Sequence, residues 1–208
     1  MKIYWIPTHA PLRVAALVKH LGLPVEFVQL DLRTAEQRSP EYARINPNMK
    51  APTLVDGDFV LWESAAIMTY LAGKAGSDMW PAGNVREQAD IVRWLSWNNS
   101  HWQPHIGQFY FEFMIKPIIG LGAADEALLK SKTPELLQAA KILDDHLAGK
   151  SFLACDRLTI ADFQLASMAS HWREAHMPFE AFANIQRWLD RLMRIPAWSD
   201  PWPERKAA

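Results

Sequence analysis

The sequence has little cysteine, no excess of charge of either sign and no long hydrophobic run. Cys155 is the single cysteine in 208 residues, which excludes an internal disulfide and suits a reducing compartment. The chain has 22 basic and 23 acidic residues, mixed along its length, which argues against a nucleic-acid or acidic-lipid partner. The opening MKIYWIPTHAP is too short for a signal peptide or membrane span. We therefore expect a cytoplasmic protein with no membrane partner.

What the sequence does contain is hydrophobic and aromatic. Half of the residues are hydrophobic and ten are tryptophan, clustered between Trp94 and Trp102 and near the C-terminus. A chain of this length can form one large domain or two small ones, each with its own core. Aromatic clusters are typical of cores, interfaces and apolar ligand sites.

The first part of the chain alternates strand and helix patterns. KIYWI and VEFVQLDL read as strands, and PLRVAALVKHLG between them has the leading proline and trailing glycine of a helix. This order predicts a βαβ unit with parallel strands. A short helix is expected over 39–44.

A hairpin and another helix are predicted next. PTLV and FVLW flank Asp56-Gly57-Asp58, a strong hairpin signal, and a helix runs from Ser64 to Gly73. Residues 1–76 therefore predict a small α/β domain with a mixed four-stranded sheet. The polar, turn-rich residues 77–84 are expected to form a linker.

Residues 85–208 predict helices only. A long helix over 85–103 is disturbed by Pro104, an amphipathic helix covers Pro134–Leu147, and FANIQRWLDRLMRI forms a further helix. In LTIADF, Thr159 and Asp162 have the spacing of a capping box, which starts a helix and has no chemical role. The fold prediction is an α/β domain followed by an all-helical domain.

Three segments in this order resemble the cytosolic glutathione transferases. INPNMKAPTLVDGDFVLWESAAIMTYL is similar to the glutathione-site segment, DRLTIADFQLA to the C-terminal helix start, and WLSWNNSHWQPHIGQ to bacterial nu-like members. The resemblance covers nearly the whole chain and also points to theta-like members. It implies a thioredoxin-like N-terminal domain that binds glutathione, with a helical-bundle C-terminal domain carrying the second-substrate pocket.

The resemblance also implies how glutathione, as co-substrate, would bind. Pro52 would follow a cis peptide bond, so that Ala51 presents its backbone to the cysteinyl unit like an added strand. Ser64, at a helix start, would bind the γ-glutamyl carboxylate. Glu63 would accept from the α-ammonium, and Lys50 would lie near the glycyl carboxylate.

Each of these residues also has a purely structural interpretation. Glu63 and Ser64 also suit an ordinary polar helix start, Lys50 a solvated surface lysine, and Pro52 a trans proline before a strand. Their combination in one segment favours the binding site.

The catalytic donor is predicted in the window PTHAPLRV. The resemblance places Thr8, five residues before Arg13, where nu-like members have the threonine that donates to the sulfur. His9 stands where theta-like members have serine, and either assists or faces solvent. Ala10 replaces the cysteine of beta-type members, which excludes a mixed disulfide with the protein there.

Aromatic and histidine residues of the second half are candidates for the second-substrate pocket. We expect Trp102, His105 and Phe109 to line it, with His101 and Trp172 as further candidates. The dimer cleft is the alternative place for the two histidines, and core packing is the equal alternative for the tryptophans. His101 and His105 have a metal-binding spacing, but no third ligand is evident, so no metal is predicted.

The sequence thus predicts an enzyme, a glutathione S-transferase that activates the thiolate for attack on small hydrophobic electrophiles, with a detoxification role. Glutathione-dependent disulfide reduction is one alternative, and a non-catalytic partner-binding protein of the same fold is another. Members of the family are typically dimers, so a homodimer is expected.

Overall fold

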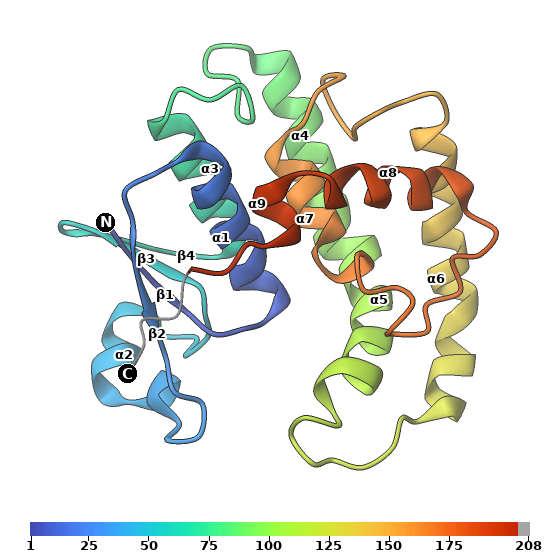
Figure 1. The fold of residues 1–208 in the computed structure, drawn as a ribbon, viewed down its shortest axis with the longest axis horizontal. Helices are drawn as coiled ribbons and strands as arrows, with labels where there is room; N and C mark the ends of the chain where they lie inside the picture. The colour runs from blue at the N-terminus through green and yellow to red at the C-terminus, as the bar shows by residue number, and fades with distance from the viewer. Residues whose placement is uncertain (204–208) are drawn as a thin grey trace. The chain divides into compact units, whose positions relative to one another are not determined.

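The structure is a computed structural model that describes residues 1–203. The chain divides into two compact units, shown in Figure 1. The sheet unit comprises Met1–Gly83 together with the segment that begins at Ile195, and the helical unit comprises Asn84–Arg194.

The sheet unit is built on four short strands in the order β2-β1-β3-β4. The strands are β1 (Lys2–Trp5), β2 (Glu26–Gln29), β3 (Thr53–Asp56) and β4 (Phe59–Trp62). β1 pairs parallel with β2 and antiparallel with β3, and β3 pairs antiparallel with β4. The predicted mixed sheet is confirmed, with the βαβ unit and the hairpin as its two halves.

Helices lie on both faces of this sheet, as Figure 1 shows for α1 and α3 on one side and α2 on the other. The bounds are α1 (His9–Leu21), a 3₁₀ turn η1 (Glu36–Arg38), α2 (Pro40–Ile45) and α3 (Ser64–Lys74). Along β1, Ile3 and Trp5 are buried, whereas the ring of Tyr4 meets the ring of Tyr42 from α2 at 5.7 Å. This alternation is the period-two pattern of a strand with two covered faces.

A single glycine, Gly22, ends α1. Gly22 adopts φ 62°, a left-handed conformation that glycine reaches without steric cost, and its N–H donates to the carbonyl of Lys19. The predicted helix and its C-cap are confirmed.

The C-terminal segment returns to the sheet unit. α9 (Pro196–Ser199) packs on α1, Lys19 Nζ pairs with Asp200 Oδ2 at 2.8 Å, and Trp202 stacks on Trp5 at 5.0 Å. The domain prediction had assigned all of 85–208 to the helical domain. The difference has a physical cause, because Trp198 is buried and the half-buried Trp202 stacks on Trp5 of the sheet unit.

The helical unit consists of helices joined by π-helical turns and loops. In order they are α4 (Val85–Trp97), the π turn η2 (Asn98–Trp102), α5 (Gln103–Tyr110), the π turn η3 (Phe111–Ile115), α6 (Glu126–Leu147), α7 (Ile160–Ala169) and α8 (Ala183–Met193). Every residue of α7 is buried, so it forms the centre of this core. Within residues 1–203, no helix is long and apolar enough to span a lipid bilayer.

One predicted helix start in this unit is wrong. α6 begins at Glu126, and Pro134 lies inside the helix instead of starting it. Asp125 caps the true start by accepting a hydrogen bond from the N–H of Leu128 at 2.9 Å. The apolar periodicity after Pro134 is clear in the sequence, whereas this polar cap carries no periodic signal.

The predicted capping box of Thr159 and Asp162 is confirmed, and Asp162 also binds groups outside the start of α7. Its carboxylate accepts hydrogen bonds from Thr159 N at 2.9 Å, Thr159 Oγ1 at 3.1 Å, Leu153 N at 2.9 Å and Trp188 Nε1 at 2.9 Å. Burial raises the pKa of Asp162 to about 6, while the hydrogen bonds act to lower it. At neutral pH one buried carboxylate therefore joins the start of α7, the preceding loop and α8.

We predict that Asp162→Asn destabilises the protein by about 2–4 kcal/mol at pH 7, since its amide group would face donors. The measurement is urea unfolding followed by circular dichroism. Because the folded-state pKa of about 6 lies above the ordinary value of 3.8, the folded wild type binds a proton more tightly than the unfolded chain. The gap between wild type and variant should therefore widen by about 1 kcal/mol from pH 7 to pH 5.

The matched control is Asp145→Asn on the surface of α6. Asp145 pairs with Lys141 at 2.8 Å in an exposed ion pair, so its loss should change stability by less than about 0.5 kcal/mol. Equal effects of the two substitutions would refute the bridging role of Asp162.

Candidate ligand site at the edge of the sheet

Strand register brings the predicted site residues of the sheet unit to one end of the sheet. Tyr4 of β1 pairs with Thr53 of β3, and Thr53 pairs with Trp62 of β4. The chain leaves β1 toward Thr8, enters β3 from Ala51, and leaves β4 toward Ser64, all at this same end. Three stretches that are far apart in the sequence thus converge here.

The segment before β3 has the backbone that the resemblance implied. The Ala51–Pro52 peptide bond is cis. Pro52 is buried, Ala51 is half-buried and Lys50 is exposed. Ala51 is therefore partly accessible, between a buried proline and an exposed lysine.

A buried polar network holds the carbonyl of Lys50. Tyr42 Oη donates to it at 2.7 Å and Asn46 Nδ2 at 2.6 Å. Thr53 Oγ1 joins the same network at 2.7 Å from Tyr42 Oη and 2.9 Å from Asn46 Nδ2. These residues were not predicted as site residues from the sequence, although polar side chains on both sides of Lys-Ala-Pro are a usable signal.

The start of α3 has an unusual backbone. Glu63 precedes the helix with φ 72° and ψ 115°, in a region that non-glycine residues rarely adopt. Such a conformation costs on the order of 1–3 kcal/mol and is found most often at ligand and active sites. The exposed Glu63 is followed by buried Ser64, the first residue of α3, so one polar group faces solvent and the other lies at the helix N-terminus.

Arg13 was not predicted as a site residue from the sequence, where it only marks the position of Thr8. It lies on α1 and is 2% exposed. Burial lowers the pKa of Arg13 to about 9, and the negative charge of Glu63 opposes that shift. Arg13 thus remains a cation at neutral pH and couples α1 to the start of α3 electrostatically. An arginine on an otherwise apolar helix face was the signal for it.

Thr8 and His9 stand where α1 begins. Thr8 is the N-cap residue in an extended conformation, and within the described chain its side chain does not cap the helix. Its backbone carbonyl accepts from the N–H of Leu12 at 3.0 Å. Thr8 and His9 are both half-buried. The Thr8 hydroxyl therefore lies at the positive end of the α1 dipole, and it makes no capping hydrogen bond to that helix.

The aromatic residues predicted for the second-substrate pocket lie mostly in the core of the helical unit. Trp102 is 0% exposed, its Nε1 donates to the carbonyl of Leu165 at 3.1 Å, and its ring stacks on Phe179 at 5.5 Å. Phe109 is also buried. These contacts favour the core alternative for both residues, whereas half-buried His105 keeps its predicted role as a hypothesis.

No metal-binding group of three or more His, Cys, Asp or Glu side chains occurs among residues 1–203. His101 is exposed and His105 is half-buried, and the described residues place no third ligand beside this pair.

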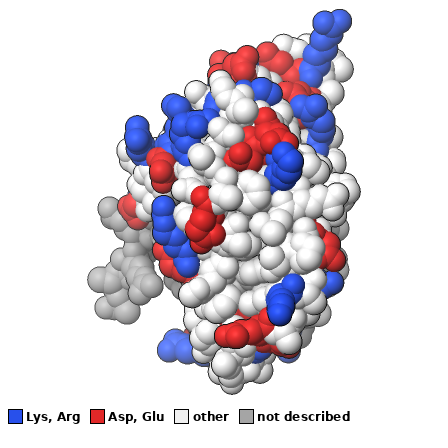
Figure 2. All heavy atoms as spheres, turned by 90° about the vertical axis from the view of Figure 1, so that its right-hand side faces the viewer, with Lys and Arg blue, Asp and Glu red and all other residues white. Residues whose placement is uncertain are grey.

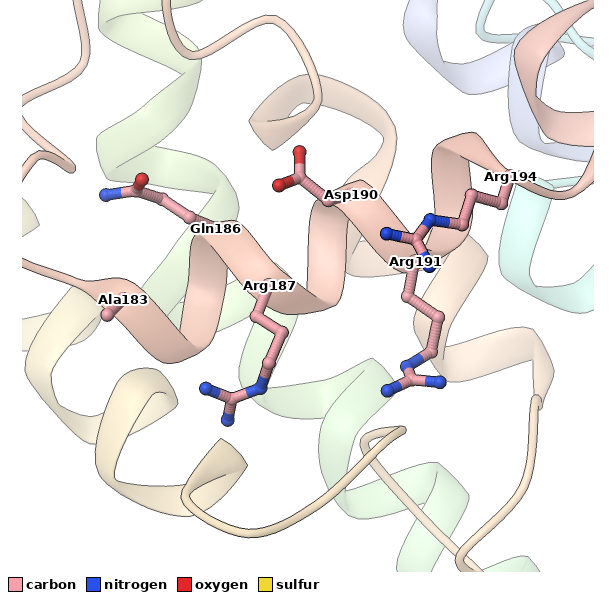
Figure 3. Close-up of a pocket in the computed structure, with 6 residues that line it drawn as sticks. All are labelled: Ala183, Gln186, Arg187, Asp190, Arg191 and Arg194. Carbon is pink, nitrogen blue, oxygen red and sulfur yellow. The ribbon is translucent and has the colours of Figure 1, made fainter.

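Two cavities among the described residues are lined entirely by the helical unit. A cavity of about 440 Å³ follows α8 and is lined by Ala183, Gln186, Arg187, Asp190, Arg191 and Arg194 (Figure 3). A second cavity of about 400 Å³ is lined by Trp172, Arg173, His176, Met177, Pro178 and Glu180. The first contains none of the predicted residues, and its charged walls do not suit an apolar ligand. The second contains Trp172.

Charge does not mark a binding surface on the side of the molecule shown in Figure 2. In Figure 2 basic and acidic side chains interleave over the side of the molecule that is shown. This agrees with the net charge of -1 and gives that side no uniform basic patch for a polyanion.

Known proteins resemble this chain over nearly its full length. The family described as Glutathione S-transferase, N-terminal domain matches residues 1–73, and Glutathione S-transferase, C-terminal domain matches residues 102–196. Glutathione S-transferase 3 of Zea mays is 34% identical over 206 residues, 95% of this chain and 91% of the relative. This plant relative does not confirm the predicted bacterial nu-like or theta-like subtype.

Solved structures share the fold. Glutathione transferase F7 of Populus trichocarpa has a TM-score of 0.89 at 24% identity, over 96% of each chain. Glutathione S-transferase-I bound with lactoylglutathione has a TM-score of 0.86 at 26% identity, over 96% of this chain and 97% of that one. With both domains matched in order and a relative above 30% identity along most of its length, the chain belongs to the glutathione S-transferase family.

Proposed function

We propose that this protein is a glutathione transferase that holds the glutathione thiolate for attack on small apolar electrophiles. The observation that carries the proposal is the strand register, which gathers the Thr8 hydroxyl, the half-buried residue Ala51 and the start of α3 at one end of the sheet. Family membership supplies the ligand class, and a related transferase is bound with lactoylglutathione, a glutathione derivative.

Glutathione would bind along the backbone of Ala51. Its cysteinyl unit would pair with the Ala51 N–H and carbonyl, as a peptide adds to a sheet edge. The γ-glutamyl carboxylate would meet the start of α3 and the Ser64 hydroxyl, where unpaired N–H groups favour an anion. Glu63 would accept from the α-ammonium and Lys50 would attract the glycyl carboxylate.

Catalysis requires a thiolate at neutral pH. A free thiol with a pKa near 8.5 is mostly protonated, and the thiolate is the nucleophile. A hydrogen bond from Thr8 Oγ1 and the positive end of α1 would both favour the anion. The sulfur then donates its electron pair to an electrophilic carbon. In a substitution the bond from that carbon to the leaving group breaks and the leaving group departs with its electron pair; in an addition to an activated double bond the π electron pair moves to the neighbouring atom, which takes up a proton from water. His9 is the second candidate donor.

The protein is further proposed to act as a homodimer in the cytoplasm, in detoxification. The surface that supports a second copy is β4, the edge strand of the sheet. Phe59, Val60 and Trp62 of this strand are 44%, 36% and 41% exposed. An exposed apolar edge strand offers unpaired backbone groups and apolar side chains, which favours pairing with another chain.

We predict that Thr8→Ala lowers the conjugation rate at least about tenfold and raises the pKa of the bound thiol by about 1–2, because one hydrogen bond to a charged sulfur is lost. Thr8→Ser keeps the hydroxyl and should retain most of the activity. The thiol is titrated by the ultraviolet absorbance of the thiolate. Should Thr8→Ala keep both the rate and the pKa, Thr8 is not the donor, and His9→Ala becomes the decisive variant.

Ser64→Ala is expected to weaken glutathione binding by about tenfold, because it removes one charge-assisted hydrogen bond to a carboxylate. Isothermal titration calorimetry measures this change. Ser199→Ala, at an exposed position of the short helix α9, is the control and should bind as the wild type does. A normal affinity of Ser64→Ala would remove Ser64 from the binding site.

Val60→Glu should convert the dimer to a monomer, because a carboxylate would be buried against the second copy. Sedimentation velocity gives the mass. Val85→Glu, at a position that is 74% exposed on the helical unit, is the control and should remain dimeric. A dimeric Val60→Glu protein would place the interface elsewhere.

The two alternative functions are separated by simple assays. Disulfide reduction would consume NADPH in the presence of glutathione, glutathione reductase and a model disulfide. A wild-type protein that gives no heat with millimolar glutathione would instead be a partner-binding member of the fold, and the proposed function would fail.

A further inference from the structure

The number of protons on each side chain determines which group donates and which accepts in every hydrogen bond of the network around Lys50. Asn46 Oδ1 accepts from the backbone N–H of Asn48 at 3.0 Å, so Asn46 Nδ2 faces the Lys50 carbonyl and Thr53 Oγ1. Tyr42 has one hydroxyl proton, which goes to the Lys50 carbonyl because a carbonyl can only accept. Thr53 must then donate to Tyr42 Oη. All polar protons of these side chains are used, and the Lys50 oxygen accepts two bonds.

This network also determines where the next N–H points. The cis bond in the described chain is Ala51–Pro52, so the Lys50–Ala51 peptide is trans. In a planar trans peptide the C=O and the following N–H point in opposite directions. Two hydrogen bonds draw the Lys50 carbonyl inward, and therefore the N–H of Ala51 is turned away from the buried network, on a residue that is half-buried.

We propose that Tyr42, Asn46 and Thr53 are positioning residues that aim the Ala51 N–H at the cysteinyl carbonyl of glutathione. This inference rests on the proposed function and names residues that do not touch the ligand. All three side chains are buried, so they act through the Lys50–Ala51 peptide plane. Without them this peptide could rotate, and the ligand would have to order it on binding.

The network connects α2 to the strand beside the site. Tyr42 comes from α2, which Ser39 caps by accepting from the N–H of Tyr42 at 3.1 Å. Thr53 begins β3 and pairs with both β1 and β4. Thr53 thus anchors the Lys50–Ala51 peptide plane to the sheet, and Tyr42 anchors it to a capped helix. A backbone that binds a ligand needs such rigid support.

The test is Tyr42→Phe, which removes one of the two bonds to the Lys50 carbonyl and keeps the ring. We expect the Kd for glutathione and the KM for glutathione to rise about tenfold, the effect of about one hydrogen bond. The KM for the electrophile and kcat at saturating glutathione should change less than about twofold, because the reacting groups are intact.

Tyr70→Phe is the matched control, because Tyr70 Oη also makes a 2.7 Å hydrogen bond, to Asp56 Oδ2 in the same unit. It should lower the melting temperature to a similar extent while leaving the Kd for glutathione unchanged. Thr53→Val provides a second test of the network and should raise the Kd in the same direction as Tyr42→Phe.

The outcomes separate this inference from the proposed function. If wild-type protein binds glutathione and Tyr42→Phe binds it equally well while melting earlier, the network is only structural and the inference is overturned. If the wild type itself gives no binding, the proposed function fails first. A raised Kd in Tyr42→Phe together with a normal Kd in Tyr70→Phe supports the positioning role.

Discussion

The structure of the candidate site depends on the register of three antiparallel strand positions, Tyr4, Thr53 and Trp62. Because these residues stand side by side, the loops that continue from them emerge at one edge. A slip of one residue would turn every side chain of a strand to the opposite face. The buried alternation along β1, with Ile3 and Trp5 on one face and Tyr4 on the other, holds this register. The packing of the sheet thus decides where the chemistry can occur.

Buried polar groups then refine what the register positions. In the sheet unit, the network around Lys50 orients a peptide plane, and the cation of Arg13 lies near the exposed carboxylate of Glu63. In the helical unit, Asp162 plays the corresponding part by joining two helices and a loop. Buried groups of this kind are costly unless every hydrogen bond is made, and for that reason they specify a single arrangement.

Substrate choice is the least defined part of the protein's function. Trp102 and Phe109 pack in the core of the helical unit, although their aromatic character also fits a ligand pocket. Aromatic content alone does not separate core from pocket, because both need large apolar surfaces. The charged cavity along α8 is also a poor site for a flat apolar molecule. Glutathione recognition is therefore better supported than recognition of the electrophile.

The sequence by itself determined the elements whose signals are local. The Asp56-Gly57-Asp58 hairpin, the Gly22 helix end, the capping box at Thr159 and the four strands all follow from spacing and turn chemistry. The tertiary structure alone decided the rest. The Tyr42–Asn46–Thr53 network, the burial of Arg13 and the return of the C-terminal segment to α1 depend on contacts between distant residues. Such contacts leave no periodic trace, because a side chain's partner is set by packing and not by its neighbours in the chain.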